Sequence, residues 1–183
     1  GSFAEYTRAS PSKLVHKPSN VGFEEAAVVP VSATTALVGL RAAEVEAGQT
    51  VLITGAGGGV GSCAVQIARA MGAEVTGVCS TSKLEFVRSL GAADAVDYTR
   101  EDITTGARTY DAIVDLAGSR RVSALRRALA PTGTPVILGG EGGGKWLGMG
   151  RQVWSQIIGI TARQRFRSPI ALVNQQDLRV LKD

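Results

Sequence analysis

The stretch TGAGGGVGS occupies residues 54–62 and directly follows the apolar run TVLIT at 50–54. A short β-branched run of this kind predicts a buried strand. The five glycines that come next predict a loop whose backbone no side chain shields. The segment VGSCAVQIARAMG at 60–72 repeats apolar residues at helical spacing and ends in glycine. The sequence here therefore predicts a strand, a tight turn and a helix.

The glycine loop also predicts a ligand. The N-terminus of a helix carries free N–H groups and partial positive charge, which together bind phosphate. In the frame Ala56, Gly58, Gly61 the loop matches GxGxxG except that alanine replaces the first glycine. Gly58 would let the backbone approach a pyrophosphate, and Gly61 would let the helix lie close to the strand. We therefore expect a dinucleotide site, with a structural glycine turn as the alternative.

From Thr50 onward, β-branched runs alternate with helical patterns, which is typical of a parallel sheet covered by helices. We expect an α/β fold over 50–183: a doubly wound, parallel, six-stranded Rossmann sheet with helices on both faces. The six strands are predicted at 50–54, 74–79, 95–98, 111–116, 135–139 and 157–163. Further helices are predicted at 81–91 and from Ser119 to just before Pro131.

Residues 1–49 have a different pattern. Two short strands are predicted at 4–9 and 13–18, followed by two helical pieces at 23–43 that break at Pro30. This segment cannot close a domain alone, so we expect it to pack against the sheet. The last residues, DLRVLKD, stop in mid-helix without a cap, which indicates a piece of a longer protein.

Composition argues against several other functions. The arginines behind the net charge of +4 are scattered rather than clustered, so we expect no nucleic-acid partner. The uncharged stretch 49–67 is rich in glycine, and we expect no membrane partner. Cys63, Cys79 and the single His16 lack metal-site spacing, so no metal is expected. Free thiols and the absence of an export signal favour a cytoplasmic location.

The end of the second predicted strand bears on which dinucleotide binds. NAD sites usually place Asp or Glu there to hold the ribose 2′-hydroxyl. Here residues 78–83 read VCSTSK, which offers hydroxyls and an ammonium but no carboxylate. Ser80 and Lys83 could therefore hold a 2′-phosphate, which favours NADPH. An ordinary helix N-cap and a solvated lysine would give the same sequence.

Short-chain dehydrogenases offer a different interpretation, because TGAGGGVG also fits their TGxxxGxG signature. That family would place the loop at the start of the domain and supply a YxxxK pair. None of Tyr6, Tyr98 and Tyr110 has a lysine four residues later. The pattern therefore disfavours this family.

Ordered phrases along nearly the whole chain carry a more specific likeness: FAEY, KP, EEAA, TTAL, VLITGAGGGVG, QIARAMGA, CSTSK, LGAADAVDY, YDAIVD, LAPTG and VILGG. With them the chain resembles the medium-chain dehydrogenase/reductase superfamily, in particular its zinc-free quinone oxidoreductase branch. The resemblance implies that residues 1–49 connect a catalytic domain, absent here, to the NADP-binding domain. One departure is Gly55, which stands where this branch often has alanine.

The resemblance also implies a set of cofactor contacts. Gly58 and the next residues, Gly59, Val60, Gly61 and Ser62, would line the pyrophosphate. Ser80 and Lys83 would meet the 2′-phosphate, with Tyr98 beside the adenosine ribose. Residues 116–118, beginning with Leu116, and 138–141, with Leu138, Gly139 and Gly140, would flank the nicotinamide half, which Thr35 would also approach. A strand-end aromatic that packs on the sheet edge is the alternative for Tyr98.

The implied activity is hydride transfer from NADPH to a quinone or an α,β-unsaturated carbonyl compound. No catalytic residue can be named, and we expect the fragment alone to be inactive. Two alternatives stay open: an NADPH-binding module without turnover, and an enoyl-reductase domain of a polyketide synthase. The resemblance further implies a homodimer through the edge strand 157–163. The alternative is an unpaired edge strand whose arginines prevent it from pairing with another chain.

Overall fold

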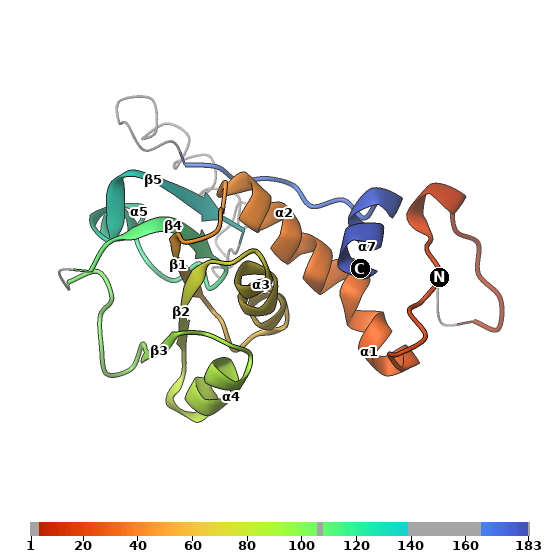
Figure 1. The fold of residues 1–183 in the computed structure, drawn as a ribbon, viewed down its shortest axis with the longest axis horizontal. Helices are drawn as coiled ribbons and strands as arrows, with labels where there is room; N and C mark the ends of the chain where they lie inside the picture. Colours follow the sequence, from red (N-terminus) through yellow and green to blue (C-terminus); the bar gives the residue numbers. More distant parts are fainter. Residues whose placement is uncertain (1–3, 106–107, 139–165, 183) are drawn as a thin grey trace, which may run out of the picture.

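The computed structural model describes residues 4–105, 108–138 and 166–182. Its centre is a parallel five-stranded sheet in the order β3-β2-β1-β4-β5 (Figure 1). This is the first half of the Rossmann order extended by two strands on the other side of β1. The strands are β1 Thr50–Thr54, β2 Glu74–Cys79, β3 Asp94–Asp97, β4 Tyr110–Asp115 and β5 Leu129–Ile137.

Both faces of the sheet are buried, as the doubly wound fold requires. Val51 and Ile53 of β1 pack into the cluster that contains α2 (Thr34–Ala42), α3 (Gly59–Ala70) and Val87 of α4 (Leu84–Ser89). The intervening Leu52 packs on the other face with Leu125 of α5 (Val122–Arg127). Because both faces of this central strand are covered, its three middle residues, Val51, Leu52 and Ile53, are all apolar and fully buried. Helices on both faces are confirmed.

The number of strands differs from the expected six. Five lie in the described residues, and the predicted strand 157–163 falls outside them. Beyond β5, a single parallel bridge joins Arg167 to Val136. The Ile137 N–H donates to the Arg167 carbonyl (2.9 Å), and the Arg167 N–H donates to the Pro135 carbonyl (3.0 Å). Backbone pairing next to β5 is therefore present at residue 167, after the end of the predicted strand.

Two of the predicted helices are confirmed and one was drawn too long. α3 ends before Gly72, which has a φ of +84°, and α4 follows a short 3-10 turn, η3 (Thr81–Lys83). The helix predicted from Ser119 to just before Pro131 is too long at both ends, because α5 runs from Val122 to Arg127. Leu129 continues the apolar spacing of α5 but already pairs with Tyr110 as the start of β5. Strand pairing and helical packing both bury this leucine, so spacing alone could not separate them.

The N-terminal segment also departs from expectation. Residues 4–22 form no strand, and their one regular element is the 3-10 turn η1 (Pro11–Lys13). The helical part does not break at Pro30: α1 (Phe23–Val28) runs through a π-helical turn, η2 (Val29–Ala33), into α2. A wider π turn accommodates the ring and the missing N–H of a proline without ending the helix.

The two ends of the chain lie together at one side of the molecule, away from the sheet (Figure 1). Arg41 of α2 pairs with Asp177 of α7 (Gln175–Lys182) at 2.5 Å. The side chain of Gln175 donates to the Leu14 carbonyl at 2.9 Å. These contacts fix the last described helix against both α2 and the N-terminal segment.

In the described part of the chain, one helix, Phe23–Ala42, is long and apolar enough to cross a membrane by length and composition alone. The core helix of a soluble protein passes the same test. Ala36, Leu37 and Leu40 are buried in this structure, and α2 contacts α3. The second half of this helix therefore packs on the sheet unit, as we expected for the segment.

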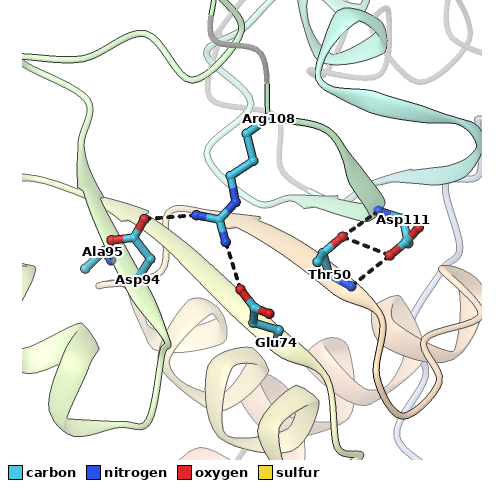
Figure 2. Close-up of polar contacts among 6 residues, drawn as sticks. All are labelled: Thr50, Glu74, Asp94, Ala95, Arg108 and Asp111. Carbon is cyan, nitrogen blue, oxygen red and sulfur yellow. Dashed lines mark hydrogen bonds and ion pairs between the residues drawn. The ribbon is translucent and has the colours of Figure 1, made fainter.

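Polar side chains close the amino edge of the sheet, where the strands begin (Figure 2). Arg108, just before β4, reaches Glu74 of β2 (3.0 Å) and Asp94 of β3 (3.1 Å). Asp111 accepts hydrogen bonds from the N–H (2.9 Å) and the hydroxyl (2.8 Å) of Thr50. These contacts link the first residues of β1, β2, β3 and β4.

Candidate cofactor site

The glycine loop turns directly from β1 into α3. Gly55 has a φ of +70°, in the left-handed region that glycine adopts without strain. A Cβ at Gly61 would lie 2.0 Å from the Gly55 carbonyl oxygen. Any side chain at 61 would thus push the helix away from the loop. This supports the expected role of Gly61, which is to let the helix lie close to the strand. The positive φ of Gly55 explains why glycine suits the position where the quinone oxidoreductase branch often has alanine.

A cavity of about 540 Å³ opens at the carboxyl ends of β1, β2, β3 and β4. Its lining brings together six residues predicted from the sequence: Gly58, Ser80, Lys83, Tyr98, Leu116 and Ala117. The rest of its lining consists of Thr54, Gly55, Gly57, Val78, Cys79, Ser119 and Arg120. In parallel α/β sheets, ligands bind at this edge, where the direction of winding changes. The strand order changes direction at β1 here, so the cavity lies at the expected place.

Other predicted residues lie elsewhere. Gly59, Val60, Gly61 and Ser62 form the first turn of α3 and do not line the cavity. Thr35 lies on α2 and is likewise not in the lining, while Leu138 packs against the core. Gly139 and Gly140 lie outside the described residues. The nicotinamide end of the predicted site is thus represented here by Leu116 and Ala117.

A hydrogen-bond network joins the end of β1 to the backbone that follows β4, next to the cavity. The hydroxyl of Thr54, at the end of β1, donates to the fully buried carboxylate of Asp115 at 2.6 Å. The Thr54 hydroxyl oxygen in turn accepts from the N–H groups of Leu116 (3.1 Å) and Ala117 (3.3 Å). The N–H of Gly118 donates to Asp115 (3.3 Å). The backbone after β4 is therefore held in one position relative to the glycine loop.

Among the described residues, the charged side chains of the cavity lining are Lys83 and Arg120, both cations. The ammonium of Lys83 lies 5.4 Å from the ring centre of Phe86. Sequence reasoning found Lys83 but missed Arg120, whose only signal was its position shortly after the end of β4. A cavity lined by cations without carboxylates favours anionic ligands.

A carboxylate does stand close by, at the end of β3. Asp97 is only 7% exposed and is not in the cavity lining. It accepts from the Thr81 hydroxyl (2.5 Å) and from the N–H (2.9 Å) and hydroxyl (2.7 Å) of Thr99. The hydrogen bond from Thr81, then those from Thr99 and the charge of Arg100, lower the pKa of Asp97. Its contacts hold the turn that carries Lys83.

The described residues contain no group of three or more His, Cys, Asp or Glu side chains able to hold a metal ion. Cys79 lines the cavity and Cys63 lies on α3, and burial raises the pKa of each thiol. These thiols are therefore poor metal ligands and weak nucleophiles at neutral pH.

The parallel sheet and the cavity at its carboxyl edge define a Rossmann-type α/β protein, and comparisons with known proteins narrow the class. The family described as zinc-binding dehydrogenase matches residues 59–165. The chain therefore belongs to this family of the medium-chain dehydrogenase/reductase superfamily, in its quinone oxidoreductase branch. Although the family's description names zinc, the described residues contain no group of three or more His, Cys, Asp or Glu side chains that could bind it.

Individual relatives agree with this assignment. The chain is 37% identical over 155 residues to an NADPH-dependent alkenal/one oxidoreductase of Arabidopsis thaliana, covering 78% of this chain and 40% of that protein. Its fold matches the quinone oxidoreductase from Coxiella burnetii with a TM-score of 0.80 at 29% identity, over 95% of this chain and 52% of that one.

A third match is the quinone oxidoreductase from Thermus thermophilus, which was solved also in complex with NADPH. Its TM-score is 0.68 at 28% identity, over 85% of this chain and 50% of that one. The chain thus spans about half the length of these proteins.

Proposed function

We propose that this chain is the NADPH-binding part of an oxidoreductase that transfers hydride to a quinone or an α,β-unsaturated carbonyl compound. One observation carries the proposal: the glycine loop, including Gly58 at the N-cap of α3, and two cations line one cavity, and the described residues of its lining include no carboxylate. The names of the matched relatives, a quinone and an alkenal/one oxidoreductase, support the substrate class.

The chain's own residues would bind and orient the cofactor. The first N–H groups of α3 have no partner within the helix and would hold the diphosphate. Ser80 and Lys83 would hold the 2′-phosphate, and the exposed Tyr98 would lie beside the adenosine ribose. The backbone of Leu116 and Ala117, fixed by Thr54, would position the nicotinamide half and exclude water from it. When bound, NADPH supplies the hydride.

A titration tests the cofactor first. We expect NADPH to bind with a change in its fluorescence and NADH to bind more weakly, since NADH offers no 2′-phosphate to Lys83. Failure to bind NADPH, or tighter binding of NADH, would contradict the proposed cofactor.

An activity assay separates this proposal from its main alternative, an NADPH-binding module without turnover. That alternative applies to this chain by itself, which spans 40% to 52% of the length of the matched relatives. Oxidation of NADPH with 9,10-phenanthrenequinone would show that the chain acts as an enzyme by itself. Binding without turnover is our expectation for the fragment, whereas the same result for the full-length protein would favour the module. An enoyl-reductase origin would appear as reduction of an enoyl thioester by the full-length protein.

Two further expectations rest on the sequence. We propose a homodimer through residues 157–163, which sedimentation at micromolar concentration would test. A single monomer species would contradict it.

We also propose a cytoplasmic location, which microscopy of the tagged full-length protein would check.

A further inference from the structure

Arg120 occupies a position in the cavity that the proposed contacts leave unexplained. It follows β4, whereas Lys83 follows β2, so the two cations stand on opposite sides of β1 in the strand order. Its side chain is only 18% exposed, although it lines the cavity. An arginine this covered is already ordered, so a ligand that contacts it loses little side-chain entropy.

The order comes from Asp102, in the loop that follows β3. The Asp102 carboxylate accepts from Arg120 at 2.5 Å and from the N–H (3.0 Å) and hydroxyl (2.9 Å) of Thr104. Hydrogen bonds from Thr104, then the charge of Arg120, lower the pKa of Asp102, so the carboxylate stays ionised at neutral pH. The pair is therefore present at neutral pH.

Core packing supports the same arrangement. Ile103, next to Asp102, is buried in one cluster with Leu125 of α5, the helix that begins two residues after Arg120. The loop after β3 and the start of α5 are therefore joined both by apolar contact and by the ion pair. This loop begins with Tyr98, at the proposed adenosine end of the cavity.

The ion pair decides what Arg120 can recognise. Asp102 offsets its positive charge at close range, which makes it a poorer phosphate ligand than Lys83. What remains is a planar guanidinium group, which stacks on aromatic rings and carries further N–H donors. A flat, uncharged ring with hydrogen-bond acceptors fits this surface better than an anion does.

We propose that Arg120, oriented by Asp102, packs its guanidinium plane against the adenine ring of the cofactor and so strengthens the binding of NADPH and NADH alike. The inference rests on the proposed function, because it assumes a nicotinamide dinucleotide in the cavity. It separates two tasks: Lys83 selects the phosphorylated cofactor, and Arg120 holds the part that both cofactors share.

The test compares dissociation constants for NADPH and NADH by fluorescence titration. Arg120→Met and Arg120→Lys should each weaken both cofactors by about tenfold, since neither side chain is planar. Asp102→Asn should weaken both by a smaller factor, because the guanidinium group remains but is held less firmly. The control Arg121→Met removes the neighbouring exposed arginine and should leave both constants unchanged. Thermal unfolding without ligand establishes that each variant is folded.

Each contrary result overturns the inference in a distinct way. Wild-type affinity in Arg120→Lys would show that charge, not the guanidinium plane, is what the cofactor meets. Loss of NADPH binding with NADH binding unchanged would make Arg120 a 2′-phosphate ligand instead. Failure of the wild-type protein to bind either cofactor would overturn the proposed function as well, whereas normal binding by Arg120→Lys and Arg120→Met would overturn this inference alone.

Discussion

At the amino edge of the sheet, charged side chains join neighbouring strands, whereas at the carboxyl edge two cations line a large cavity. Arg108 joins Glu74 and Asp94 at the first edge, and the smaller cavity there, about 200 Å³, is lined by acidic residues that include Glu44 and Asp111. At the second edge Lys83 and Arg120 line about 540 Å³. The charged side chains that line the two cavities thus have opposite signs: negative at the amino edge and positive at the carboxyl edge.

This difference follows from how parallel strands are connected. Each strand ends in a turn that leads into a helix or a loop, so backbone N–H groups and variable side chains collect at the carboxyl edge. The amino edge receives chain that returns from the other end, and hydrogen bonds such as those between Thr50 and Asp111 fix its position. We therefore expect substitutions at the carboxyl edge to alter binding and those at the amino edge to alter stability alone.

The largest effect should come from Gly61→Val. The new side chain would overlap the Gly55 carbonyl, because even a Cβ would lie 2.0 Å from it. We expect the free energy of unfolding to fall by about 1–3 kcal/mol, and NADPH binding to weaken as α3 moves. Urea unfolding and a titration measure the two effects. Gly59→Ala is the control for stability, since its Cβ would meet only the Ser32 hydroxyl at 3.4 Å. Equal stability of the two variants would contradict close helix packing.

Lys83→Met should come next. Loss of a charged hydrogen-bond partner costs about 1.5–3 kcal/mol, so NADPH affinity should fall by roughly ten- to hundredfold while NADH affinity stays the same. Lys13→Met removes the same charge from η1, outside the cavity, and should change neither constant. A parallel loss of both cofactors in Lys83→Met would show that Lys83 does not read the 2′-phosphate.

Acid should act on the carboxyl edge through Asp97. Its pKa is lowered from 3.8, so its stabilising effect is complete above that value and is lost as the pH falls below it through the folded-state pKa. Urea unfolding at pH 7 down to pH 2 should show a shallower acid loss in Asp97→Asn than in the wild type. Glu101→Gln, on the same loop, should keep the wild-type slope. Identical slopes for the wild type and Asp97→Asn would rule out this role.

Arg108→Met should have the smallest effect. Both of its ion pairs are partly exposed, and such pairs contribute about 0.2–1 kcal/mol. The free energy of unfolding should fall by that amount and the loss should shrink in high salt, while NADPH binding should not change. Weaker NADPH binding would show that the two edges are coupled, and the comparison between them would then fail.

Much of the fold could be predicted from the sequence because local patterns and long-range packing agree there. The run TVLIT, the glycine loop and the stripe of α3 each occur as predicted. The predictions failed where two structures bury the same residue, as at Leu129, or where a rare backbone form intervenes, as at Pro30. In both cases only packing against other segments decides between the alternatives.

By itself, the sequence determined the order of strands and helices between residues 50 and 137, the bare turn at residues 55–61 and the membership of a dehydrogenase family, since each depends on neighbouring residues or on ordered motifs. Only the tertiary structure decided which side chains share the cavity. Arg120 and Asp102 are 18 residues apart and carry no common motif. They meet because β1 and β2 separate β3 from β4, so the chain that follows β3 must cross one face of the sheet, where Ile103 is buried with Leu125 of α5.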